Sequence, residues 1–87
     1  MLEHRREPRH LCHEAAFLQV FNPASPERLE IRVIDTSEGG LAIYSPIFLP
    51  RGAEVRVRRG DNFVYGTIRY CVPSGSGFRA GVEITNA

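Results

Sequence analysis

LEIRVIDTSEGGLAI, residues 29–43, places a set of turn-forming residues between two apolar runs. Leu29 to Ile34 alternates apolar and charged side chains, the pattern of a strand with one face in the core. Leu41 to Ile43 is the second apolar run, and Asp35 to Gly40 lies between the two. An acid, a hydroxyl and two glycines favour a tight reversal whose polar groups gather on one rim. We therefore predict two antiparallel strands joined by a polar turn.

The polar turn also carries groups that suit ligand binding. Asp35 offers two acceptor oxygens, and the hydroxyl of Ser37 both donates and accepts hydrogen bonds. Gly39 and Gly40 permit a positive φ and let a ligand or another backbone approach closely. Taken alone, the Asp-x-Ser-x-x-Gly pattern is more often an ordinary hairpin turn than a binding site.

A second polar cluster, Arg5-Arg6-Glu7-Pro8-Arg9, lies near the N-terminus. Pro8 biases the preceding residue towards extended backbone. The guanidinium fork of arginine matches phosphate oxygens and the O6/N7 edge of guanine, and its flat face stacks on a base. An isolated charge run is more often a solvated basic terminus. We predict a flexible segment, residues 1–9, that carries this arginine motif.

Together, Arg5-x-x-x-Arg9 and Asp35-x-Ser37-x-x-Gly40 resemble the paired motifs of the PilZ domain family, bacterial receptors for cyclic di-GMP. The order of the two motifs, their internal spacings and their separation all match the family. The corner from Pro50 to Gly52 and the closing strand from Phe78 to Ile84 are also similar to PilZ sequences. The resemblance covers roughly Arg5 to Ile84, which is nearly the whole chain.

The resemblance implies that cyclic di-GMP is the ligand. The implied ligand-binding residues are Arg5, Arg6, Arg9, Asp35, Ser37, Gly39 and Gly40. The arginines would contact guanine or phosphate and stack on a base, Asp35 would accept from guanine N1 and N2, and Ser37 would bond a phosphate. The two glycines would let the backbone approach the ligand. Binding would move the N-terminal segment, and a protein partner or an adjoining domain would read that change.

The rest of the chain predicts a barrel of six short strands. The further strands are expected at His10 to Phe21, whose inward face is ambiguous, and at Glu54 to Arg58, Phe63 to Val72 and Phe78 to Thr85. Glu54 to Arg58 alternates strictly, so its two valines are expected to face inward. Composition predicts loops at Asn22 to Glu27 and Pro73 to Gly77, and an apolar plug at Ile47 to Leu49. With no helical period in the sequence, this pattern favours a closed or nearly closed antiparallel barrel. The resemblance also implies a six-stranded barrel.

We therefore expect a single all-β PilZ-type domain at residues 10–87, without the long C-terminal helix that many PilZ domains carry. The sequence has no long apolar run and no apolar leader, so we expect a cytoplasmic protein without membrane insertion. Cys12 and Cys71 lack the spacing of metal ligands and are expected to be thiols in or near the core. Opposite-facing His13 and Cys12 would not form a compact metal site, so we expect no metal or cofactor.

Other classes of function fit the sequence less well. Ser37 has no evident base and Asp35 no matched acid–base partner, so we do not expect an enzyme. The main alternative is a PilZ-like protein–protein adaptor that binds no nucleotide, whose expected mark is the loss of one of the two motifs. A barrel that binds single-stranded nucleic acid would require exposed aromatic residues among cations. Phe63, Tyr65 and Tyr70 are available, but we expect their strand to supply the core. The net charge of +1 also argues against a nucleic acid polymer as partner.

Overall fold

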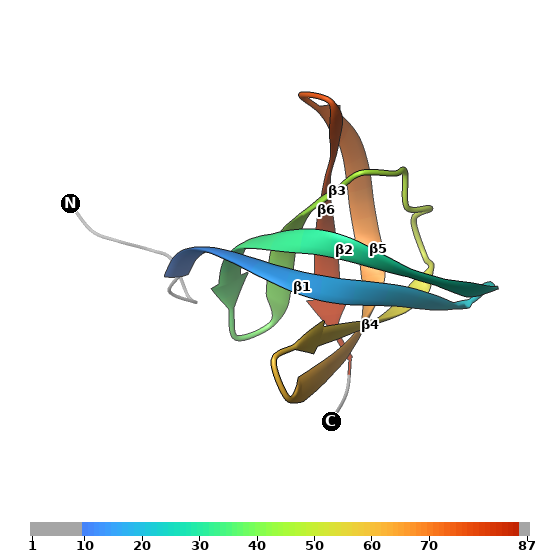
Figure 1. Ribbon diagram of the computed structural model, residues 1–87, viewed down its shortest axis with the longest axis horizontal. Helices are drawn as coiled ribbons and strands as arrows, with labels where there is room; N and C mark the ends of the chain where they lie inside the picture. Colours follow the sequence, from blue (N-terminus) through green and yellow to red (C-terminus); the bar gives the residue numbers. More distant parts are fainter. Residues whose placement is uncertain (1–9, 86–87) are drawn as a thin grey trace.

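The computed structural model describes residues 10–85, which form six antiparallel strands (Figure 1). These strands are β1 (His10–Asn22), β2 (Ala24–Ser37), β3 (Gly40–Ser45), β4 (Glu54–Arg59), β5 (Asn62–Ser74) and β6 (Gly77–Ile84). They close in the order β1-β2-β3-β6-β5-β4, because β4 pairs with β1. The predicted six-stranded antiparallel barrel is confirmed. Residues 10–85 contain no helix that is long and apolar enough to cross a membrane.

Alternating side chains build the core of the barrel. Ile31 and Val33 of β2 and Val55 and Val57 of β4 are buried, which confirms the predicted inward faces. In β1, whose face was ambiguous, the even-numbered residues such as Leu18 point inward. The free thiols of Cys12 and Cys71 are partly buried and pack against this core, as predicted.

Two expected loops are instead tight hairpins. β2 already begins at Ala24, so the loop expected at Asn22 to Glu27 is wrong. Pro26 lies within β2 at a register irregularity between paired residues, where its missing N–H breaks no ladder bond. The loop expected at Pro73 to Gly77 is also wrong, because β5 continues to Ser74 and β6 begins at Gly77. The turn between β5 and β6 uses Gly75, with a φ of 58°.

The expected apolar plug is only partly present. Leu49 is buried, whereas Ile47 and Phe48 are exposed. The strand that carries Phe63, Tyr65 and Tyr70 supplies core residues, as expected, but these three aromatic side chains are themselves exposed. In β5 the inward positions are taken by smaller residues, Val64, Gly66 and Ile68, two of them fully buried and the third packed against the core. The aromatic residues between them therefore stand on the outer face.

Candidate functional site

The Asp-x-Ser-x-x-Gly motif spans the end of β2 and the start of β3. β2 continues through Asp35 to Ser37, so the six-residue turn expected at Asp35 to Gly40 shortens to Glu38 and Gly39. Ser37 pairs with Gly40 across this hairpin. The motif is therefore mostly strand, and its side chains are placed by the register of the sheet.

The first residues of β1 pair with the same end of β2. His10 stands opposite Thr36, and Leu11 stands opposite Asp35. Arg5, Arg6 and Arg9, the predicted arginine contacts, lie outside the described residues. The strand that follows the arginine motif in the sequence thus begins beside the Asp-x-Ser motif.

A β-bulge at Ile34 decides where Asp35 points. The bulge gives β2 one extra residue relative to β3, so that Asp35 stands opposite Ala42. Ala42 lies on the outer face of the barrel because both of its neighbours in β3 belong to the core cluster. Residues paired across strands share a face of the sheet, so Asp35 also faces outward. Ser37, two residues further on, lies on the same face.

Asp35 is nevertheless almost covered, with 6% of its surface exposed. Its Oδ2 lies 3.8 Å from Nη2 of Arg79, an ion-pair distance that is too long for a direct hydrogen bond. Arg79 stands opposite Tyr44 in the pairing of β3 with β6, so it reaches diagonally across β3 to Asp35. Arg79 is a cation of the site that the sequence motifs did not include.

A surface depression of about 160 Å³ lies beside this ion pair, over β3 and β6. Its described lining residues are Ser37, Gly40, Leu41, Ala42, Arg69, Tyr70, Gly81, Val82 and Glu83. Gly40, Ala42 and Gly81 form the floor of the depression, and Ser37 and Tyr70 stand at its sides. Of the predicted site residues, the structure thus brings Ser37 and Gly40 to one depression.

Gly40 is needed because another backbone approaches it. A Cβ added there would lie 2.8 Å from the carbonyl oxygen of Val82 in β6. The glycines with a positive φ in residues 10–85 are elsewhere in the chain, at Gly52, Gly60 and Gly75. The predicted close approach of backbone is therefore confirmed for Gly40, while the positive φ allowed at Gly39 and Gly40 is not used.

Tyr70 forms the opposite wall of the depression. An extra residue in β5 at Arg69 shifts the register, so that Tyr70 stands opposite Gly81. A Cβ on Gly81 would overlap the Tyr70 ring, which shows that the ring lies across the β6 backbone. Arg69 forms an ion pair with Glu83 next to it. Sequence reasoning missed this wall, although an outward glycine inside a strand signals close packing of a neighbour.

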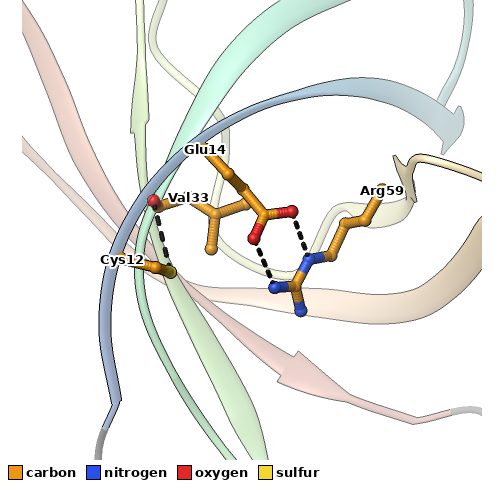
Figure 2. A network of polar contacts seen from close by, with 4 residues as sticks. All are labelled: Cys12, Glu14, Val33 and Arg59. Atoms are coloured by element: carbon orange, nitrogen blue, oxygen red, sulfur yellow. Dashed lines mark hydrogen bonds and ion pairs between the residues drawn. The ribbon is translucent and has the colours of Figure 1, made fainter.

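A second polar network holds β1 to β4 beyond their last paired residues (Figure 2). Glu14 accepts two hydrogen bonds from Arg59, at 2.7 Å from Nη2 and 3.0 Å from Nε. These bonds lower the pKa of Glu14 below its ordinary value of 4.5 and raise the pKa of Arg59. The thiol of Cys12 donates to the carbonyl oxygen of Val33 at 3.6 Å. The network stabilises the part of β1 that leads to the site.

Comparisons with known proteins bear on this architecture. The sequence matches the profile of the PilZ domain over residues 3–87. Comparison with curated proteins gave no match. The fold is similar to that of the inhibitor of motility (MotI/DgrA) of Bacillus subtilis, with a TM-score of 0.73 and 12% sequence identity. The similarity covers 98% of this chain and 44% of that protein's chain, so this chain spans less than half of its length. At this identity the likeness concerns the fold alone.

Proposed function

The chain belongs to the PilZ domain family, and on that premise we propose that it is a receptor domain for cyclic di-GMP. One observation carries the proposal: the first residues of β1 pair with the end of β2 that holds Asp35 and Ser37. The arginine motif precedes β1 directly in the sequence. This register supports the use of both motifs on one ligand.

Asp35 is the residue that selects guanine in this proposal. Its carboxylate accepts from N1–H and the N2 amino group, a donor pair that adenine lacks. Arg79 acts as the counter-ion of Asp35, at 3.8 Å, and compensates a negative charge that the sheet almost covers.

Ser37 and the small floor of the depression serve the rest of the ligand. The Ser37 hydroxyl binds a phosphate, and Gly40 lets the ligand lie close to the sheet. Arg5 and Arg9 contact guanine or phosphate in bidentate fashion and stack on a base, with a further contact from Arg6.

The signal passes through the N-terminal segment. The arginines hold the ligand against the barrel, so the segment that carries them changes its position when the ligand binds. A protein partner or an adjoining domain reads that change. We propose that this happens in the cytoplasm, without a further cofactor.

Isothermal titration calorimetry tests the proposal. The chain should bind cyclic di-GMP with micromolar or tighter affinity, and cyclic di-AMP and GTP much more weakly. A folded protein that gives no heat with cyclic di-GMP, and shows no competition for it, would instead be an adaptor that binds no nucleotide.

A further inference from the structure

A surface of aromatic and arginine side chains covers a part of the barrel away from Asp35. It lies on the outer face of β1, β4 and β5 and the adjoining part of β2. We call it the aromatic–arginine face and define it by Phe17, Phe21, Arg28, Arg56, Arg58, Phe63 and Tyr65. The four aromatic residues are between 38% and 46% exposed. Exposed aromatic side chains gathered on one face indicate a binding surface.

The register of the barrel creates this surface. Two cross-strand rows run from β1 through β4 to β5: Phe17–Arg58–Phe63 and Gln19–Arg56–Tyr65. In each row an arginine of β4 stands between residues of the two neighbouring strands. Cations and aromatic rings therefore alternate over the sheet, although they come from distant parts of the sequence.

Contacts among these side chains hold the arginines in place. The Cζ of Arg28 lies 5.2 Å from the centroid of the Phe17 ring, and that of Arg56 lies 4.8 Å from the Phe63 ring. Both distances are those of cation–π pairs. Arg56 also donates to the side-chain oxygen of Gln19 at 3.2 Å. These contacts fix the positions of the two guanidinium groups on the outer face of the sheet.

The surface is hollowed at two adjoining places. One depression, of about 230 Å³, is lined by Gln19, Phe21, Arg56 and Tyr65. The next, of about 250 Å³, is lined by Phe17, Gln19, Arg28, Arg56, Arg58 and Phe63. They share the hydrogen-bonded pair of Gln19 and Arg56, and no described lining residue is acidic. Each depression thus offers an aromatic ring, an arginine and an amide.

The arginines of this face have no carboxylate partner in residues 10–85. The ion pairs of the described chain involve Arg59, Arg69 and Arg79. Within residues 10–85, no carboxylate therefore lies at ion-pair distance from Arg28, Arg56 or Arg58. A second copy of the chain would bring the same three cations to this face, and the like charges would repel one another.

We propose that the aromatic–arginine face binds single-stranded nucleic acid, with successive nucleotides in the two depressions. This goes beyond reception of cyclic di-GMP and uses a different part of the barrel. Bases stack on Tyr65, on Phe21 and on the guanidinium groups that rest on phenyl rings, as in other sheet surfaces that bind single strands. The arginines donate to the phosphates, and Gln19 to base edges.

The two similar depressions favour single-stranded nucleic acid over an acidic protein as the ligand of this face. Two adjoining depressions that each combine a ring and a cation match a ligand that repeats a flat base and an anion. The expectation against nucleic acid had two grounds, a strand that supplies the core and a low net charge. That strand does supply the core, but its side chains Phe63 and Tyr65 are exposed and available to a ligand. The low net charge remains, so affinity comes from stacking and local contacts rather than from long-range attraction.

Fluorescence anisotropy of the full chain with labelled 20-nucleotide strands, oligo(dT) and oligo(U), tests the proposal. We expect dissociation constants of about 10⁻⁴–10⁻⁶ M at moderate salt. A 20-base-pair duplex should bind more weakly, because its base faces are covered. With three arginines at phosphates, the slope of log K against log salt should be about −2.

Matched variants locate the site. Tyr65→Ala should weaken oligonucleotide binding about five- to 150-fold, the usual range for one base–aromatic stack. Phe63→Ala should also weaken binding, because it removes the ring that lies against the Arg56 guanidinium. Arg56→Gln should weaken binding and make the salt slope shallower. Phe48→Ala and Arg51→Gln, which change exposed residues between β3 and β4, should leave it unchanged. Thermal unfolding and circular dichroism check that each variant is folded.

Further arms separate this site from the proposed receptor site. Asp35→Ala should keep oligonucleotide binding, and saturating cyclic di-GMP should not displace the oligonucleotide. The proposal is overturned if no strand binds at protein concentrations above about 10⁻⁴ M. It is also overturned if the control variants weaken binding equally.

Binding of poly-glutamate in place of the oligonucleotides, weakened by the same variants, would identify an acidic-protein surface. Self-association through this face without oligonucleotide binding would identify a dimer interface. Either result contradicts the proposal.

Discussion

Asp35 and Arg79 form an ion pair across β3 on the outer face of the barrel, with Oδ2 and Nη2 3.8 Å apart. The carboxylate is nearly covered, whereas the Arg79 side chain is 42% exposed. The charge of Asp35 in the Asp-x-Ser motif is thus balanced by a residue from a strand near the C-terminus. This pairing places the candidate site over three strands, β2, β3 and β6.

The arginine motif should serve the ligand and not the fold. Arg5→Ala or Arg9→Ala should weaken cyclic di-GMP binding by about 1.5–3 kcal/mol, the scale of a lost hydrogen bond to a charged group. Calorimetry measures the affinity, and the melting temperature without ligand should change little. An Arg9→Ala protein that no longer folds without ligand would contradict this division.

Asp35 should serve both the ligand and the fold. Asp35→Ala should weaken cyclic di-GMP binding and lower the free energy of unfolding by about 1 kcal/mol, because it removes the side chain that anchors the end of β2. A double-mutant cycle with Arg79→Ala should give a coupling of about 0.5–1 kcal/mol, as expected for residues in contact whose pair is partly exposed. Unchanged affinity in Asp35→Ala would show that the motif is only a structural hairpin.

Gly81 should be required by the Tyr70 ring. Gly81→Ala should lower the free energy of unfolding by about 1–2 kcal/mol through overpacking, because the new Cβ overlaps the ring. Urea unfolding measures the effect. In a Tyr70→Ala background the same substitution should be nearly neutral. Gly40→Ala is the matched control, since its Cβ meets the Val82 carbonyl and Tyr70→Ala should not rescue it.

The Glu14–Arg59 ion pair should make stability depend on pH in the acid range. The pKa of Glu14 is lowered below its ordinary value of 4.5 by its hydrogen bonds to Arg59. The contribution is therefore present in full above that value and lost as pH falls through the lower folded-state pKa. Because the Glu14 side chain is 39% exposed, we expect less than about 1 kcal/mol. At pH 7 the melting temperature of Glu14→Gln should be lower than that of the parent protein. At a pH below the folded-state pKa of Glu14 the two melting temperatures should be equal. A Glu14→Gln penalty that persists at low pH would assign the effect to packing.

Local pattern was enough to predict most of the strands. Alternation in residues 29–34 and 54–58 identified inward faces that the structure confirms at Ile31, Val33, Val55 and Val57. Side chains alternate along any strand, so this information is present in the sequence itself. Prolines were misleading in the two expected loops, because a proline is tolerated in a strand wherever its N–H has no partner to reach.

The sequence by itself determined the six strands, the barrel class and the two motifs that identify the family. Tertiary structure decided which way the site residues point. Single extra residues at Ile34 and Arg69 turn Asp35 and Tyr70 to the outer face, and a bulge depends on the partner strand rather than on local composition. Pairing between distant strands also brings Arg79 to Asp35, and it gathers Phe17, Arg56 and Tyr65 on one surface. Such neighbours are set by register across the closed sheet, which no local pattern in the sequence specifies.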